Sequence, residues 1–457
     1  MILDKKNIHF VGVGGIGMSG IAFILAGMGY KVSGSDLKMN ALTSKIENSG
    51  GRIYKGHNSS NVGPETEAVV FSSAISGDNP EIVEAKRRNI PIVQRAEVLG
   101  ELLNAKKGIA VSGTHGKTTT TSLISVMLEN SGLDPTVIIG GEMEAFNGNA
   151  KAGSGQYLVA EADESDGSFL HLKPLYSVIT NIEMEHMDYY KSLDDVLKSY
   201  SAFANNIKES GSVFYNYADA NASKVLKGFK GVTESFGYSP DADIHAVDVK
   251  MEAFDTSYTC VYKNKTLGKV GLKIPGMHNV LNSLAAILVG LRMGIAFDTI
   301  TNSIKDFKGT KRRFHLRSDS GDVILIDDYA HHPTEIKAVL SACRNWKGRR
   351  VIVIFQPHRY SRTMHLADEF GKSFDGADKL ILTEIYAASE KPIEGISVKS
   401  IYDKVKLNGH IDAVMMDKGK ITDHVMKIKR PGDMILVLGA GNITEIADEL
   451  SKKLSDK

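Results

Sequence analysis

The chain has 457 residues, of which 42% are hydrophobic and 24% are charged, the balance of an ordinary globular protein with apolar cores. Its 55 basic and 54 acidic residues leave a formal net charge of +1, so no overall field attracts nucleic acid or an anionic membrane, and any anion site must be local. Two cysteines are too few for a disulfide framework or a cysteine metal site, and the length predicts about three domains.

Residues 8–30 contain no Asp, Glu, Lys or Arg, a feature that secretion signals and membrane spans share. Charged residues precede this stretch, however, and glycines from Gly12 to Gly29 interrupt it. Both features favour a strand, a turn and a helix. We therefore expect a cytoplasmic protein that binds neither a membrane nor nucleic acid.

Three consecutive segments alternate short apolar runs with helix-forming stretches, the pattern of parallel α/β sheets. We expect domains over residues 1–106, 107–310 and 311–457. The predicted strands are 8–13, 31–35, 68–72 and 90–93 in the first; 109–112, 157–160, 178–181 and 213–216 in the second; and 323–326, 351–355, 379–383 and 434–438 in the third.

Residues 240–275 differ from the rest of the middle segment. Three runs within them alternate apolar and polar residues like antiparallel strands, with turns expected at Asn264 and Gly268. We expect these strands to extend one edge of the middle sheet.

A strand over residues 8–11 leads into a glycine-rich turn and then a helix over residues 18–28. Such a turn lets backbone N–H groups approach a pyrophosphate, and the helix dipole favours the anion. Asp36 ends the next strand, about 20 residues later, where dinucleotide sites carry a ribose-binding acid. The pattern fits a nicotinamide dinucleotide, another nucleoside diphosphate, or glycines needed only for packing. The glycines are Gly12, Gly14, Gly15 and Gly17.

A second phosphate-binding loop follows the strand 109–112 and opens a helix. Gly113 and Gly116 permit a bend that turns N–H groups toward phosphates. Lys117 can reach the terminal phosphates of ATP, and the Thr118 hydroxyl can hold Mg²⁺. The loop residues predicted to bind ATP are Gly113, Thr114, His115, Gly116, Lys117, Thr118 and Thr119.

This loop is shorter than the standard P-loop. The standard loop has a glycine five residues before its Gly–Lys pair, and Val111 stands at that position here. The difference argues against switch-type and motor NTPases but not against ATP. The simpler alternative is a helix N-cap rich in threonine and glycine.

Glu161 and His186 each follow a predicted strand, at the edge where the second loop also lies. An acid at this edge can complete a Mg²⁺ shell that bridges ATP phosphates. Because Mg²⁺ prefers oxygen ligands, His186 predicts that Mn²⁺ substitutes well. Either acidic cluster alone would fit a solvated loop, but together with Thr118 they predict a metal site.

Further along the chain, His278 and Asn282 share one face of a helix and can hold the edge of an adenine, although Asn279 can also cap this helix. Arg313 lies at a domain boundary, from which its guanidinium can reach phosphates. Asp328 follows the strand 323–326 at the next sheet edge.

Histidines and arginines follow the strands of the third segment. Arg359 and Arg362 are three residues apart and can clamp a carboxylate or phosphate, although such a pair is also a common surface feature. The residues predicted to bind the amino acid or a carboxylate are His332, His358, Arg359 and Arg362.

These motifs resemble the Mur ligase family over nearly the whole chain. The residues that match in order are 113–118, Glu161, 186–188, His278, Asn279, Asn282, Arg313 and Asp328. Within the family, residues 9–20, 328–333 and 356–362 are similar to the member that adds L-alanine. The rival is the ligase that recycles a murein tripeptide onto the same UDP-sugar, and residues 165–169 favour the alanine enzyme.

The resemblance implies three domains: a Rossmann-like N-terminal domain that binds UDP-N-acetylmuramate, a central ATPase-type sheet, and a Rossmann-like C-terminal domain that closes on L-alanine. It assigns the first glycine loop to the UDP diphosphate and adds Ser73 to that site. It also implies that ATP phosphorylates the lactyl carboxylate and that L-alanine attacks the resulting acyl phosphate. The catalytic residues implied are Lys117, Glu161, His186, Arg313 and Asp328.

Two other classes of protein remain as alternatives. A nicotinamide-dependent oxidoreductase would leave the second phosphate loop unexplained. A non-catalytic P-loop regulator is disfavoured by Val111 and by the histidines and arginines of the third segment.

Overall fold

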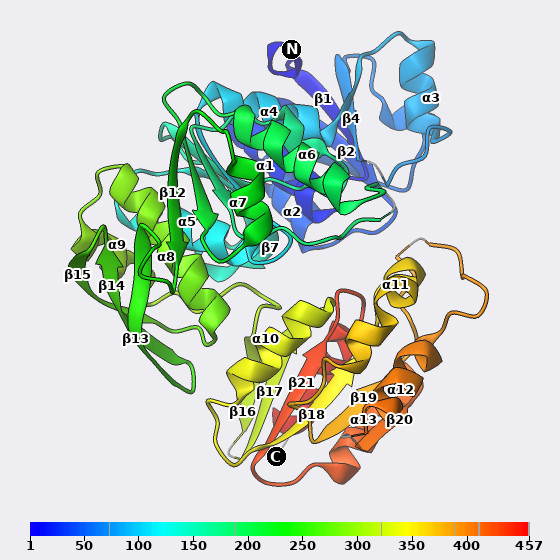
Figure 1. Ribbon diagram of the computed structural model, residues 1–457. Coiled ribbons are helices and arrows are strands. Elements are labelled where there is room, and N and C mark those ends of the chain that lie inside the picture. The colour runs from blue at the N-terminus through cyan, green and yellow to red at the C-terminus, as the bar shows by residue number, and fades with distance from the viewer. Residues whose placement is uncertain (73, 188, 321, 389, 410–411, 456–457) are drawn as a thin grey trace. The chain divides into compact units, whose positions relative to one another are not determined.

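The computed structural model describes residues 1–72, 74–187, 189–320, 322–388, 390–409 and 412–455 (Figure 1). Among these residues the strands form three sheets of five, ten and six strands, and helices connect them. The predicted α/β class with three sheet-based domains is thereby confirmed. Within the described ranges, no helix is both long and apolar enough to cross a lipid bilayer.

The N-terminal sheet is parallel and has the strand order β3-β2-β1-β4-β5, the order of a Rossmann fold. Ile8 and Phe10 of the central strand belong to the core that includes α1, while Val11 packs with Ile82 of α3. The elements are β1 (Asn7–Val11), α1 (Ile16–Gly27), β2 (Lys31–Asp36), α2 (Ala41–Asn48), β3 (Arg52–Lys55), β4 (Ala68–Phe71), α3 (Pro80–Arg87), β5 (Ile92–Gln94) and α4 (Arg95–Ala105).

The middle sheet has the order β15-β14-β13-β12-β11-β10-β6-β9-β7-β8, with β6 parallel to both of its neighbours. Its strands are β6 (Lys107–Ser112), β7 (Thr136–Met143), β8 (Gly148–Lys151), β9 (Tyr157–Glu161), β10 (Tyr176–Ile179), β11 (Ser212–Asn216), β12 (Val232–Gly237), β13 (Ile244–Glu252), β14 (Asp255–Tyr262) and β15 (Lys265–Leu272). Its helices are α5 (Lys117–Asn130), α6 (Leu193–Asn205), α7 (Ala220–Leu226), α8 (Met277–Arg292) and α9 (Phe297–Ile304).

Strands β13, β14 and β15 do extend one edge of this sheet, as predicted. The turn between β14 and β15 is formed by Lys263 and Asn264, both with positive φ, which suits a tight hairpin. The turn predicted at Gly268 is wrong, because Gly268 lies inside β15. A Cβ at Gly268 would lie 3.0 Å from the Phe297 ring, so close packing rather than a turn accounts for this glycine.

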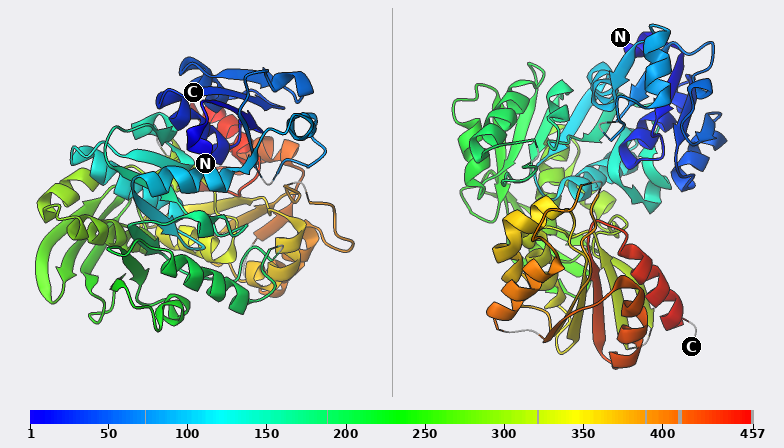
Figure 2. Two further views of the ribbon diagram at one scale, coloured as in Figure 1. Left: turned by 90° about the horizontal axis from the view of Figure 1, so that it is seen from above. Right: turned by 90° about the vertical axis from the view of Figure 1, so that its right-hand side faces the viewer.

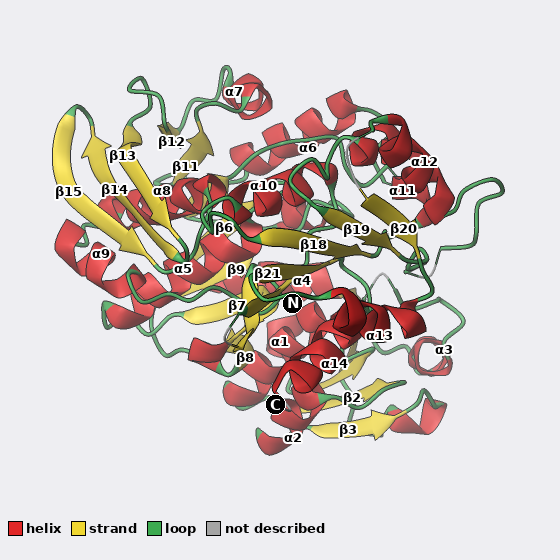
Figure 3. Ribbon diagram, turned by 90° about the horizontal axis from the view of Figure 1, so that it is seen from below, coloured by secondary structure: helices red, strands yellow, loops and turns green. Residues whose placement is uncertain are grey.

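The C-terminal sheet has the order β16-β17-β21-β18-β19-β20 and is parallel except for β16. Helices α10, α11 and α12 cover one face, and α13 and α14 cover the other (Figure 3). The elements are β16 (His315–Ser320), β17 (Val323–Asp328), α10 (Pro333–Cys343), β18 (Arg350–Phe355), α11 (Tyr360–Gly371), β19 (Lys379–Leu382), α12 (Val398–Leu407), β20 (Asp412–Met415), α13 (Lys418–Ile428), β21 (Asp433–Leu438) and α14 (Thr444–Ser455).

The polar edge strand β16 is not expected from the sequence, because its residues show no apolar run. The sheet is Rossmann-like in its two helical layers, but its last strand, β21, lies between β17 and β18.

By their contacts, the residues form two compact units, drawn from two further sides in Figure 2. The first comprises Met1–Asp248, Tyr258–Val270 and Leu281–Phe307, and the second comprises Val249–Ser257, Gly271–Val280 and Lys308–Lys457. Within the first unit, α1 lies beside β7 and β8. Ile21 of α1 and Ile138 of β7 belong to one buried core, so the N-terminal and middle sheets are packed together.

Candidate functional site

The second glycine loop, between β6 and α5, is held by the residues that follow the neighbouring strand β10. The backbone N–H of Thr114 donates to Asn181 O at 3.0 Å, and that of His115 donates to Asn181 Oδ1 at 2.9 Å. Thr180 Oγ1 and Asn181 Nδ2 both donate to His115 O, at 2.5 and 3.0 Å. A Cβ at Gly113 would lie 2.0 Å from Thr180 Oγ1, so this position requires glycine.

Gly116 ends the loop as the N-cap of α5, with a left-handed φ of 85°. A Cβ at this position would lie 2.7 Å from Asn282 Oδ1. Asn282 Oδ1 also accepts a hydrogen bond from Thr120 Oγ1 at 3.1 Å. Asn282, predicted to bind adenine, therefore packs against the phosphate loop and the first turn of α5.

Lys117 points its ammonium at a buried acid, Glu164, that no motif in the sequence marks. Lys117 Nζ lies 2.8 Å from Glu164 Oε1 and donates to Gly113 O at 2.5 Å. His186 Nε2 lies 3.8 Å from the same Glu164 oxygen. Burial alone would lower the pKa of Lys117, but the negative charges of Glu164 and Asp163 outweigh it and raise the pKa. Lys117 is thus a cation at the loop, as a phosphate site needs.

The predicted metal residues lie at one edge of the middle sheet. Thr118 is buried in the first turn of α5, Glu161 ends β9, and His186 follows β10, while β6 lies between these two strands. Glu161 Oε1 accepts the N–H of Gly140 at 2.6 Å.

The donor set fits a divalent cation. A hydroxyl, a carboxylate and an imidazole are ligands that Mg²⁺ and Mn²⁺ accept in proteins, although the imidazole suits Mn²⁺ better. Glu164 Oε2, beside Lys117 and His186, is buried without a hydrogen-bond partner among the described residues. Burial raises the pKa of Glu164 and the charge of Lys117 opposes the rise, so a further cation at this edge would stabilise the ionised carboxylate.

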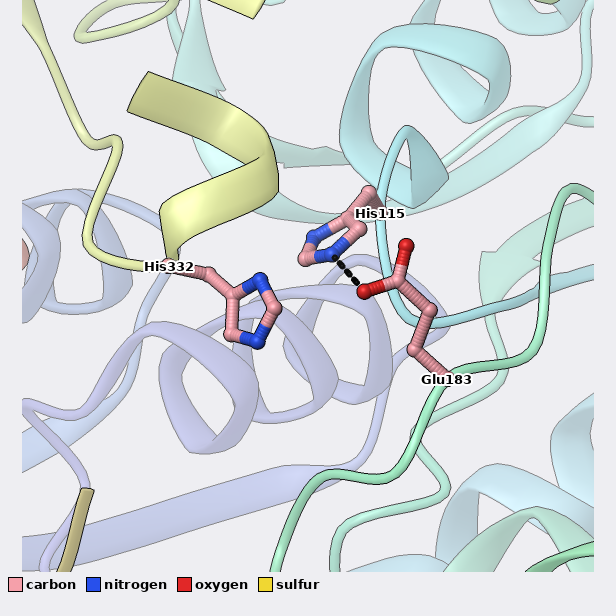
Figure 4. A group of neighbouring side chains, drawn as sticks. All are labelled: His115, Glu183 and His332. Carbon is pink, nitrogen blue, oxygen red and sulfur yellow. Dashed lines mark ion pairs between the residues drawn. The ribbon is translucent and has the colours of Figure 1, made fainter. Parts of the chain in front are cut away.

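His115 extends from the loop toward an acid of the next segment. His115 Nε2 lies 3.6 Å from Glu183 Oε2 (Figure 4), and the Glu183 N–H donates to Thr114 Oγ1 at 2.8 Å. His332, also labelled in Figure 4, belongs to the second unit and caps α10 there. Its Nδ1 accepts from Thr334 N at 3.4 Å, so the structure gives this predicted substrate residue a helix-capping role.

In the first glycine loop, Asp36 contacts the backbone of the turn itself. Gly14 N–H donates to Asp36 Oδ2 at 2.8 Å, and a Cβ at Gly14 would lie 2.9 Å from that oxygen. Gly12 has a φ of 78°, and Gly15 is the N-cap of α1. A Cβ at Gly17 would lie 3.0 Å from the Arg95 guanidinium. The predicted Ser73 lies outside the described residues.

In the second unit, Asp328 accepts backbone hydrogen bonds that hold the chain next to Arg313 in place. It accepts the backbone N–H of Phe314 at 2.6 Å and that of Ala330 at 2.7 Å. Burial raises the pKa of Asp328 to about 6, against the opposing charge of Arg313. The Arg313 guanidinium lies 5.1 Å from the centre of the Tyr329 ring.

His278 lies near Arg313 within the second unit. Removal from water lowers the pKa of His278 to about 4, and the positive charge of Arg313 adds to the effect. The ring is therefore neutral at physiological pH. Asn279 lies in the first turn of α8, where its Nδ2 donates to Pro275 O at 2.7 Å.

Arg359 and Arg362 have different neighbours in the structure. The Arg362 guanidinium is buried and contacts His358 Nδ1 at 3.1 Å and His358 O at 3.2 Å. Arg359 Nη1 lies 3.9 Å from Glu390 Oε1. The His358 ring stacks on Tyr386 with 5.7 Å between ring centres.

Sequence models of the Mur ligase family match three consecutive parts of the chain. The catalytic-domain model of the family matches residues 7–107, the middle-domain model matches 111–290, and the glutamate-ligase-domain model matches 312–441. A curated UDP-N-acetylmuramate–L-alanine ligase of Geotalea uraniireducens is 47% identical over 450 residues, covering 98% of each chain. The ligase of the same name from Pelotomaculum thermopropionicum is 45% identical over 457 residues, covering 99% of each.

Two solved structures have the same architecture. The UDP-N-acetylmuramate–alanine ligase of Thermotoga maritima superposes with a TM-score of 0.83 at 29% identity, covering 98% of each chain. A murein peptide ligase of Psychrobacter arcticus superposes with a TM-score of 0.71 at 24% identity, covering 99% of each, which is a likeness of fold alone.

Proposed function

Because this chain belongs to the Mur ligase family, we propose that it joins L-alanine to the lactyl carboxylate of UDP-N-acetylmuramate at the expense of ATP. The observation that carries this proposal is the 44–47% identity, over 98–99% of the chain, to relatives named for that activity. The product is a peptidoglycan precursor, and ADP and phosphate are released.

Two alternatives are set aside. A nicotinamide-dependent oxidoreductase accounts for only the first glycine loop, and a non-catalytic P-loop regulator accounts for only the second, whereas family membership accounts for the whole chain.

The reaction proceeds in two steps. The lactyl carboxylate attacks the γ-phosphate of ATP and gives an acyl phosphate, which turns a poor electrophile into a good one. The amine of L-alanine then attacks the acyl carbon, and phosphate leaves. Phosphoryl transfer needs positioned positive charge rather than covalent help from the protein.

The loop of residues 113–119 holds the ATP phosphates in this proposal. Lys117 supplies a positive charge at the loop, and Thr180 and Asn181, which follow β10, hold the loop in place. Thr118, Glu161 and His186 would hold Mg²⁺ or Mn²⁺, which would supply positive charge to stabilise the phosphates during transfer. His278, Asn279, Asn282 and Arg313 complete the ATP contacts.

The first glycine loop, with Asp36 and Ser73, receives the UDP part of the sugar nucleotide. Its N–H groups and the start of α1 suit a diphosphate. Asp328 positions Arg313 through the backbone of Phe314. His332, His358, Arg359 and Arg362 receive L-alanine and its carboxylate, and the enzyme works in the cytoplasm.

The test is phosphate release from ATP and Mg²⁺ in the presence of UDP-N-acetylmuramate, with single amino acids or the murein tripeptide added in turn. We expect release that requires both the sugar nucleotide and L-alanine. Release with the tripeptide but not with L-alanine would reassign the chain to tripeptide recycling. Release without any sugar nucleotide would overturn the substrate assignment.

A further inference from the structure

The N-terminal domain contains a fully buried carboxylate that belongs to neither glycine loop. Glu81, in the first turn of α3, is 0% exposed. Burial alone would raise the pKa of Glu81, but interactions with His9, Ser35 and Asn61 outweigh it and lower the pKa to about 2. The side chain is therefore an anion at neutral pH, and its partners must compensate for its lost hydration.

Both oxygens of Glu81 accept hydrogen bonds from the ends of two strands. Oε2 accepts from the Ser35 hydroxyl at 2.5 Å and lies 3.3 Å from His57 Nδ1. Oε1 accepts from Asn61 Nδ2 at 2.6 Å and from the Asn58 N–H at 3.2 Å. Ser35 lies in β2, and the other three follow β3, so one carboxylate joins the carboxyl ends of both strands.

The direction of these hydrogen bonds fixes the tautomer of His57. The Ser35 hydroxyl has a single proton and directs it at Glu81, so its oxygen accepts from His57 Nδ1, which lies 2.9 Å away. The Nδ1–H of His57 is thus shared between Ser35 Oγ and Glu81 Oε2. In the neutral ring this leaves Nε2 as the hydrogen-bond acceptor.

The same residues hold the first glycine loop. Ser35 O accepts the backbone N–H of Gly12 at 2.9 Å and of Val13 at 3.0 Å. Asn61 Nδ2 also donates to the carbonyl of Gly56, directly after β3, at 3.2 Å. Through Ser35 and Asn61, the Glu81 carboxylate connects the turn of the first glycine loop to the residues that follow β3.

We propose that Glu81 is a positioning residue for the nucleoside diphosphate site: it holds the first glycine loop and His57 in the geometry that receives UDP. The inference rests on the proposed function of that loop. Because Glu81 is fully buried, it acts through Ser35, Asn61 and His57 rather than by touching the ligand.

Glu81→Gln keeps the shape of the side chain but removes one acceptor. If the amide nitrogen faces Ser35, it meets the Nδ1–H of His57, and if it faces Asn61, it meets two N–H donors there. Two donors that face each other in a buried site cost free energy unless one group moves. We therefore expect the residues that hydrogen-bond to Glu81, and with them the first glycine loop, to change position.

The experiment measures KM for UDP-N-acetylmuramate and for ATP in the phosphate-release assay, and the Kd of UDP alone by calorimetry. For Glu81→Gln we expect the KM of the sugar nucleotide and the Kd of UDP to rise about tenfold, with the KM of ATP within about twofold of wild type. The matched control is Glu84→Gln on the same helix, because Glu84 pairs with Arg87 at 2.8 Å. The control should leave both KM values unchanged.

A Glu81→Gln enzyme with wild-type melting temperature and wild-type affinity for UDP would overturn the inference. If wild type itself does not bind UDP, the proposed function of the loop fails and takes the inference with it. If Glu81→Gln does not fold, Ser35→Ala decides, because it removes one hydroxyl and leaves Asn61 and Asn58 on the carboxylate. A rise confined to the KM of the sugar nucleotide supports the role, and an unchanged value overturns it.

Discussion

The Lys117 ammonium contacts both the phosphate loop and a buried acid. Its Nζ donates to Gly113 O and pairs with Glu164, which is only 3% exposed. The sequence predicts Lys117 from the loop motif, but it does not single out Glu164 from the acidic run 161–166. Lys117 and Glu164 lie 47 positions apart, so their pairing depends on β6 lying beside β9.

Replacing Lys117 by alanine should abolish most turnover and also reduce stability. The loss of one positioned cation commonly costs about 10²–10³ in rate. Breaking a buried pair leaves Glu164 without its partner, at roughly 3 kcal/mol. Adding Glu164→Gln should restore the melting temperature but not phosphate release. Turnover near the wild-type rate in Lys117→Ala would remove this residue from the mechanism.

The Glu81 carboxylate should make the stability of the protein depend on pH in the acid range. Its pKa falls from 4.5 to about 2 on folding, so its contribution is present above pH 4.5 and is lost as the pH falls toward 2. The contribution at neutral pH is on the order of 3 kcal/mol. Urea unfolding at several pH values should show a steeper acid loss for wild type than for Glu81→Gln. Parallel curves for the two proteins would contradict this assignment.

At the scale of elements, the predicted strands are mostly correct because buried parallel strands carry apolar runs that are legible in the sequence. Strand β16 is missed because it is a polar edge strand, and Gly268 is assigned to a turn because glycine marks both turns and close packing. Of the site, the sequence predicts the loops but not the role of Thr180 and Asn181, which follow the neighbouring strand β10 and hold the second loop. The sequence around Thr180 and Asn181 contains no motif that indicates this contact with the loop.

The left-handed start of α5 should tolerate no side chain. Gly116→Ala places a Cβ in a conformation that costs about 1–2 kcal/mol and puts it 2.7 Å from Asn282 Oδ1. We expect a lower melting temperature and a higher KM for ATP. The control is Gly132→Ala at the other end of α5, which also has positive φ but no neighbour within 4 Å. The control should lose stability only, and equal KM values for both variants would contradict this account.

At the scale of the whole molecule, the N-terminal and middle sheets share a core although each has its own strand order. The sequence predicts two separate domains here because each sheet has its own run of strands. It does not indicate that α1 packs against β7 and β8. Gly20 of α1 lies against this surface, since a Cβ there would be 3.4 Å from Ala150.

A chain that lacks residues 1–106 should therefore fold poorly. Removal of residues 1–106 exposes apolar side chains of β7 and β8, among them Ile138 and Ala150, which belong to the shared core. We expect aggregation and loss of cooperative melting, with rescue by co-expression of residues 1–106. Cooperative melting of the shortened chain at the wild-type temperature would show that the middle sheet is independent.

The second compact unit is assembled from three stretches of chain, because Val249–Ser257 and Gly271–Val280 belong to it together with Lys308–Lys457. A gene recombined with that of a relative by one crossover after Phe307 would bring only the last of these stretches from the new parent. The first two would come from the old parent, so the unit would be a mosaic of two lineages. Compatible chimaeras should therefore require exchange of all three stretches, which restricts how this part of the molecule can be swapped in evolution or by design.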